Sequence, residues 1–190
     1  MLLTKFLSLA LFTSPIIAVP LASLELTGEQ TFIETSIKDV LTSVVDKTIA
    51  LSAAVKGFDG NIQNSGPIIT ASQGLLDTIV NGTKIVQAAH SLSYIGLLAV
   101  TGPTLNLNKA SEKVSEAVVG KKPLFEKAGL APVVLGQLKG QQTAAQALVD
   151  ILLTKVPLGT VTLSKTLSAP SLEALEYAVQ VYSGKATING

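Results

Sequence analysis

Apolar residues recur at intervals of three and four along almost the whole chain, which is the spacing of amphipathic helices. The first run begins at Thr27, whose spacing to Gln30 is that of a capping box, and it ends at Gly57. Its apolar positions form one stripe: Ile33, Ile37, Val40, Val44, Leu51 and Val55. The spacing therefore predicts one long helix that buries this stripe against the rest of the chain.

A second and a third helix are predicted from proline and glycine residues, which favour helix ends. The second begins after Ser65-Gly66-Pro67, and its predicted stripe is Ile69, Leu76, Ile79, Val86 and His90. The third begins near Ser91 and is expected to break at Gly102-Pro103. It then resumes, bends at residues 121–123 and ends at Ala128-Gly129.

The C-terminal third of the chain predicts two more helices. One runs from Ala131-Pro132 to Pro157, and the other begins after Ser168-Ala169-Pro170. Residues 160–167 alternate in a way that fits a strand, a helical turn or a loop. The sum is an all-α fold, a single-domain bundle of about five amphipathic helices.

The first 18 residues have the order of a secretory signal peptide, with Lys5 before an apolar stretch and the small residue Ala18 at its end. Pro15 and Pro20 leave this stretch shorter than the roughly 20 apolar residues of a membrane-spanning helix. We expect a signal at residues 1–18, a lead-in at 19–30, a helical domain at 31–183 and a tail at 184–190. The protein is predicted to be secreted, extracellular or associated with the cell wall, without a transmembrane anchor.

Composition excludes several classes of function. The chain has no cysteine and no arginine, and once Lys5 is removed 13 lysines face 13 acidic residues, so nucleic acid is not an expected partner. One histidine, His90, cannot build a zinc site, and the sequence has no Gly-x-Ser-x-Gly motif and no EF-hand loop. We therefore predict no catalytic residue, no metal, no cofactor and no enzymatic activity.

One glycosylation sequon is present, Asn81-Gly82-Thr83 in the second predicted helix. Asn81 falls on the side opposite the predicted apolar stripe, together with Asp77 and Lys84. This placement predicts a glycan at Asn81 that faces solvent.

Several segments resemble the fungal hydrophobic surface-binding protein A family, which includes cell-wall mannoproteins. They are residues 53–60 at the end of the first helix, 79–83 in the second, 120–125 before Ala128-Gly129, and 155–157. The resemblance covers Phe32 to Tyr182. It implies a secreted helical bundle that adsorbs to hydrophobic surfaces and, in some members, binds long-chain fatty acids between helices.

Helix faces rich in alanine, valine and glycine fill less volume than faces of leucine and phenylalanine, so they leave room for a tunnel between the helices. The alternative for the same stripe residues is an ordinary filled core. We predict that this tunnel binds a long-chain fatty acid or another lipid. A donor at its mouth would hold the headgroup, and Tyr94, Tyr182, His90 or a lysine are alternatives. The candidate apolar lining residues are Ile33, Ile37, Val40, Val44, Leu76, Ile79, Val114, Leu138, Val149, Leu175 and Val179.

The alternative hypothesis is surfactant-like adsorption to solid hydrophobic surfaces, in which the helices open at the interface and recruit a hydrolase to it. A third hypothesis, an enzyme, would depend on His90 as the sole imidazole of the chain.

Overall fold

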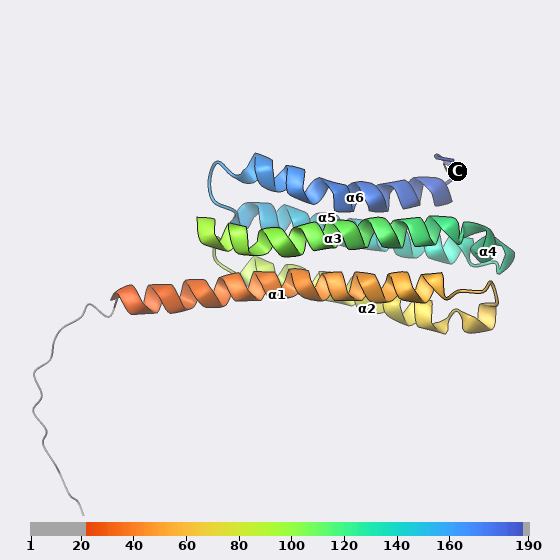
Figure 1. Ribbon diagram of the computed structural model, residues 1–190, viewed down its shortest axis with the longest axis horizontal. Helices are drawn as coiled ribbons and strands as arrows, with labels where there is room; N and C mark the ends of the chain where they lie inside the picture. Colours follow the sequence, from red (N-terminus) through yellow and green to blue (C-terminus); the bar gives the residue numbers. More distant parts are fainter. Residues whose placement is uncertain (1–21, 188–190) are drawn as a thin grey trace, which may run out of the picture.

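The computed structural model describes the backbone of residues 22–187 and the side chains from Ser36 onward (Figure 1). The predicted signal at 1–18 and the final residues 188–190 lie outside the described residues. The helices are α1 (Ala22–Lys56), the short 3-10 helix η1 (Ile62–Asn64), α2 (Gly66–Ala88), α3 (Tyr94–Gly120), α4 (Lys122–Lys127), α5 (Ala131–Lys155) and α6 (Val161–Tyr182).

The predicted all-α bundle is confirmed, and no strand is present between residues 22 and 187. The structure has six α-helices rather than about five, because α4 is a separate six-residue helix after α3. Gly129 follows it with a left-handed φ of 72°, and the backbone N–H of Leu130 donates to the carbonyl of Phe125 at 2.8 Å. The chain therefore turns back into α5 at the point where Ala128-Gly129 predicted a helix end.

The five long helices lie side by side along the long axis of the molecule (Figure 1). Helix α1 packs against α2 and α3, α2 packs against α5, and α6 packs against both α3 and α5. These contacts close a ring in the order α1, α2, α5, α6, α3. Every long helix therefore turns one face toward a common interior.

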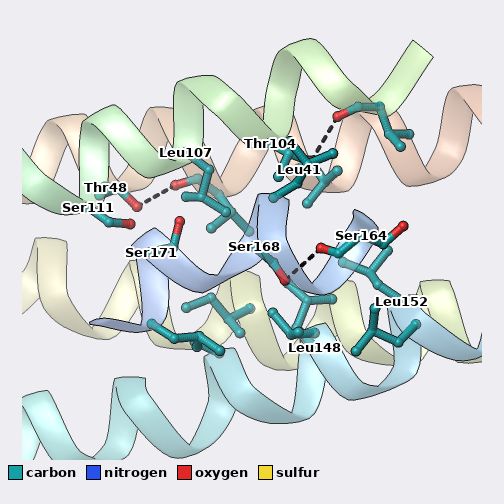
Figure 2. Close-up of a pocket in the computed structure, with 18 of the residues that line it drawn as sticks. Leu41, Thr48, Thr104, Leu107, Ser111, Leu148, Leu152, Ser164, Ser168 and Ser171 are labelled. Atoms are coloured by element: carbon teal, nitrogen blue, oxygen red, sulfur yellow. Dashed lines mark hydrogen bonds between the residues drawn. The ribbon is translucent and has the colours of Figure 1, made fainter. Parts of the chain in front are cut away.

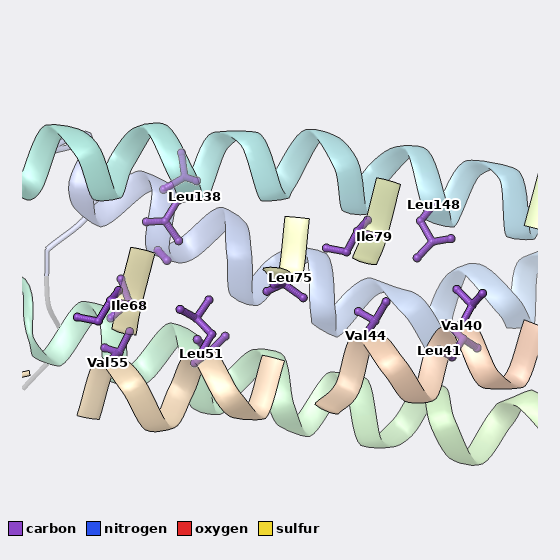
Figure 3. Close-up of a cluster of buried hydrophobic side chains, with 14 of the residues drawn as sticks. Val40, Leu41, Val44, Leu51, Val55, Ile68, Leu75, Ile79, Leu138 and Leu148 are labelled. Carbon is purple, nitrogen blue, oxygen red and sulfur yellow. The ribbon is translucent and has the colours of Figure 1, made fainter. Parts of the chain in front are cut away.

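The stripe predicted on the first helix is confirmed from Ile37 to Val55, and these side chains are buried (Figure 3). At the end of α1, Phe58 stacks on Phe125 with ring centroids 4.7 Å apart, and both rings are buried. Helix α1 begins at Ala22, five residues before the predicted start at Thr27. Among the helices between residues 22 and 187, none combines the length and the hydropathy that crossing a membrane requires.

The predicted break at Gly102-Pro103 is wrong, because α3 runs without interruption through Pro103. A proline inside a helix loses one backbone hydrogen bond and costs about 3 kcal/mol. Helix α3 packs against α1 and α6, and Val100 and Leu107 place apolar side chains inward on both sides of the proline. This packing on both sides holds the helix together across the lost bond.

The predicted start of the last helix is also wrong, because α6 begins at Val161 and contains Pro170. Residues 161–167 are therefore helical, which settles the ambiguity of that stretch. Asn108 of α3 spans the proline: its Nδ2 donates to the carbonyl of Leu167 at 2.8 Å, and its Oδ1 accepts from the hydroxyl of Ser171. A neighbouring helix thus binds polar groups on both sides of Pro170.

Gly82 permits the close contact between α2 and α1. A Cβ atom built at this position would lie 2.6 Å from Cγ1 of Val40, which is buried. We expect Gly82→Ala to lower the free energy of unfolding by about 1–3 kcal/mol, because the two helices would have to separate. Chemical denaturation monitored by circular dichroism measures this change.

Gly74→Ala is the matched control in the same helix, since nothing lies within 4 Å of its Cβ position. Alanine there should stabilise the protein by up to about 1 kcal/mol through helix propensity. Equal effects of the two substitutions on the free energy of unfolding would show that the close contact with Val40 does not require glycine at position 82.

Candidate functional site

An elongated cavity, cavity 1, lies between the helices of the ring and has a volume of about 100 Å³. Leucine and valine side chains from α1, α2, α3, α5 and α6 dominate its lining (Figure 2). On α3 the lining runs from Leu97 to Val114, which corresponds to roughly 25 Å at 1.5 Å per residue. Cavity 1 is therefore long, narrow and apolar.

Hydroxyl groups interrupt this apolar lining, and most of them are satisfied within their own helix. The hydroxyl of Thr48 donates to the carbonyl of Val44 at 2.8 Å, and that of Ser168 donates to the carbonyl of Ser164 at 3.0 Å (Figure 2). Thr101 and Thr104 likewise donate to carbonyls four residues earlier. These side chains present little unused polarity to the cavity.

Ser164 is different, because its Oγ is buried and has no hydrogen-bond partner within the described part of the chain. It lies in the first turn of α6 and lines cavity 1. An unpaired buried hydroxyl costs roughly 1–3 kcal/mol. A ligand oxygen placed beside Ser164 would recover that hydrogen bond.

A second cavity, cavity 2, lies toward the α4 end of the bundle and has a volume of about 110 Å³. Its lining is again mostly apolar and includes Leu51 of α1, Ile68 of α2, Phe125 of α4 and Leu138 of α5. Gln141 of α5 lines both cavities.

Six of the eleven predicted lining residues lie at these cavities. Cavity 1 is lined by Val44, Ile79, Val114, Val149 and Leu175. Leu138 lines cavity 2 instead. The structure therefore brings five predicted positions from α1, α2, α3, α5 and α6 together around one space.

Four other predicted positions are not among the lining residues of either cavity. Ile37, Val40 and Val179 are buried in the packed core, and Leu76 is half-buried. Ile33 belongs to α1 by its backbone, but its side chain lies outside the described residues.

The stripe predicted on the second helix is rotated relative to the observed one. Ile69 is 50% exposed and His90 is exposed, whereas the buried face of α2 carries Ile68, Ser72, Leu75, Ile79, Gly82 and Val86. The prediction missed Leu75 because Ser72 and Gly82 are not apolar, so a stripe drawn through apolar residues alone passes beside them. Ser72, three residues before Leu75, and Gly82, three residues after Ile79, were the available signal for the buried face.

None of the predicted headgroup donors lines either cavity. Tyr94 is exposed and donates to the carbonyl of Leu158 at 3.3 Å, and no lysine of the described part of the chain lines either cavity. Tyr182 donates to the carbonyl of Val118 at 2.9 Å, and its burial raises the pKa of the phenol above the usual value of 10. Its hydroxyl therefore stays protonated and fastens α6 to α3.

The predicted glycosylation site lies apart from both cavities, and the described part of the chain has no group of metal ligands. Asn81 is exposed on α2, so its side chain is accessible to a glycan, and attachment itself stays a prediction. Within residues that the structure describes, no three His, Asp or Glu side chains gather in a group that could hold a metal ion.

The amino-acid sequence is similar to those of known proteins. Residues 35–154 match the profile described as hydrophobic surface binding protein A. Cell wall mannoprotein 1 of Aspergillus flavus is 30% identical over 144 residues, covering 76% of this chain and 52% of that protein. Cell wall mannoprotein 1 of Aspergillus fumigatus is 30% identical over 151 residues, covering 80% and 52%. The chain spans about half the length of these curated relatives.

Solved structures share the fold. Ligand binding domain 1 of the Penicillium marneffei MP1 protein, complexed with arachidonic acids, superposes with a TM-score of 0.74 at 24% identity, covering 77% of this chain and 96% of that one. AFMP4P in complex with palmitic acid superposes with a TM-score of 0.75 at 22% identity, covering 78% and 99%.

The unpaired hydroxyl of Ser164 leads to a prediction for the lipid-free protein. Ser164→Ala should leave the free energy of unfolding unchanged or raise it, because no hydrogen bond is lost. Ser168→Ala removes a bonded hydroxyl in the same helix and should lower it by about 1 kcal/mol. Denaturant titration of both variants after delipidation tests the difference, and an equal loss in both would show that Ser164 has a partner.

Proposed function

The chain belongs to the hydrophobic surface binding protein A family, and on this basis we propose that it is a non-catalytic protein that binds a long-chain fatty acid in cavity 1. The observation that carries the proposal is the shape of this cavity, a lumen between five helices that is lined mainly by leucine and valine. A single unbranched acyl chain has this shape. The related domains that bind arachidonic acid and palmitic acid have the same fold, which supports the assignment.

Hydrophobic burial provides the affinity. At about 0.8 kcal/mol per buried methylene, an acyl chain of about 14 methylenes gains roughly 11 kcal/mol before the entropic costs of binding are subtracted. Among the residues whose side chains the structure describes, none that lines cavity 1 is charged. The binding energy of such a ligand therefore comes from its tail, and the headgroup chiefly sets its direction.

Ser164 is the residue proposed to hold the carboxylate. Its unpaired Oγ donates to a carboxylate oxygen, and its place in the first turn of α6 puts that oxygen near the positive end of the helix dipole. The tail then extends along α3 toward Val114, where the lining is apolar. This orientation leaves His90 without a role, since it is exposed and outside both cavities.

Secretion and a place outside the cell or in its wall are part of the same proposal. The relatives are named as cell wall mannoproteins, and the pattern of residues 1–18 is that of a signal peptide. An exposed Asn81 on the outer face of α2 fits a glycosylated secreted protein.

A larger side chain at Ala145 would fill part of cavity 1 and leave its polar side chains unchanged. Ala145 lines cavity 1 and Ala147 is exposed on the same helix. Ala145→Phe should weaken the displacement of a fluorescent fatty acid by palmitate at least about tenfold, because its ring occupies space needed by the tail. Ala147→Phe should leave it unchanged. Unaltered affinity in a folded Ala145→Phe protein would place the ligand elsewhere.

Adsorption to hydrophobic solids is a second candidate, favoured by a patch that we call the apolar tip. The tip lies where α3 begins and where α5 connects to α6, at one end of the bundle (Figure 1). Its exposed side chains are Tyr94 (64%), Ile95 (75%), Leu98 (74%), Leu158 (91%) and Leu163 (56%). No Asp, Glu or Lys occurs in residues 91–108 or 156–164. An exposed apolar patch of this kind is typical of an interaction surface.

The apolar tip predicts where adsorption occurs. The double variant Ile95→Ser, Leu98→Ser should deplete several-fold less from solution onto polystyrene particles, because it removes the two exposed side chains at the start of α3. Ile49→Ser, Ile62→Ser is the control, since Ile49 is exposed on α1 and Ile62 is exposed in η1, which joins α1 to α2 at the opposite end of the bundle (Figure 1). An equal loss in both pairs would mean that adsorption uses general surface hydropathy instead.

A further inference from the structure

Cavity 1 and cavity 2 adjoin end to end within the ring. On three helices the lining passes from one cavity to the other within three or four residues, which is about one 5.4 Å turn. The pairs are Thr48 and Leu51 on α1, Leu75 and Ser72 on α2, and Val114 and Val118 on α3, with the cavity 1 residue first. A barrier only one helical turn thick therefore separates the two spaces.

Gln141 lies in this barrier. Among the residues that the structure describes, it alone lines both cavities, and its side chain is buried at 4% exposure. Its Nε2 donates to Oγ of Ser72 across the lumen at 2.9 Å, and that hydroxyl donates in turn to Oε1 of Gln137 at 3.0 Å. The three side chains link α2 to α5 through a chain of hydrogen bonds.

This network opposes the passage of an apolar chain. A buried amide that loses its partner costs roughly 1–3 kcal/mol, and a methylene beside it offers no hydrogen bond in return. A tail that advances from cavity 1 must either stop at Gln141 or displace it from Ser72. Beyond the network the lining becomes apolar again, with Leu138 and Val134 on α5.

We propose that Gln141 is the partition that sets the length of acyl chain the protein accepts, and that cavity 2 is an extension of the site closed by it. This inference rests on the proposed binding of a fatty acid in cavity 1. With Gln141 in place, the tail has the α5 segment from Gln141 to Leu153, roughly 18 Å at 1.5 Å per residue. Without it the segment continues to Leu130, roughly 17 Å further.

The test compares the affinities of palmitate and of the much longer saturated acid behenate, measured by displacement of a fluorescent fatty acid from the full-length secreted protein. In the wild type, palmitate should bind more tightly. Gln141→Ala should shift the ratio of the two affinities toward behenate by about tenfold or more, because further methylenes become buried in cavity 2. Ser72 retains its bond to Gln137 in this variant, so the α2 hydroxyl stays paired.

Gln142→Ala is the matched control, since Gln142 bonds to Glu176 on α6 and lines neither cavity. Adding Val134→Phe to the Gln141→Ala protein should restore the wild-type ratio by filling cavity 2. If Gln141→Ala does not fold, as judged by circular dichroism, Gln141→Ser opens the same gap and replaces it.

The outcomes separate this inference from the function on which it rests. A wild type that binds neither acid overturns the proposed function, and the partition with it. A wild type that binds palmitate while Gln141→Ala keeps the same ratio overturns the partition alone. A shift that Gln142→Ala reproduces, or that Val134→Phe does not reverse, also contradicts it.

Discussion

The closed ring of five long helices is the constraint on which the rest of the structure depends. Each long helix packs against two ring neighbours, so the common interior is lined by all five and filled only by the side chains that reach it. The ring is tightened at particular contacts: Gly82 lets α2 approach Val40, and Asn108 binds α6 around its proline. At one end the stacked rings of Phe58 and Phe125 close the core. A lumen is the consequence of this arrangement.

Polar side chains inside that lumen differ in whether their hydrogen-bonding groups already have partners. Thr48 and Ser168 use their hydroxyls on carbonyls of their own helices, so they tolerate an apolar neighbour. Gln141 uses its amide to join α5 to Ser72 of α2. Ser164 keeps a hydroxyl without a partner in the described residues. Under the proposed function, Ser164 would bind a headgroup and Gln141 would stop a tail.

The sequence predicted the helical class and the α1 stripe well, because periodicity within one helix determines which face is buried. It misjudged Pro103 and Pro170, because the packing and the Asn108 hydrogen bonds that compensate for them come from other helices. It also could not separate Val44, which lines cavity 1, from Ile37, which fills the core on the same stripe. That distinction depends on how the ring closes, which no single helix encodes.

Native mass spectrometry of the protein, followed by lipid extraction, tests the central claim most directly. The account predicts a discrete added mass equal to one long-chain fatty acid, which disappears after extraction and returns on incubation with palmitate. A clean unliganded mass that persists in the presence of excess palmitate would contradict it, because an apolar lumen of this length that binds fatty acids should then hold an acyl chain.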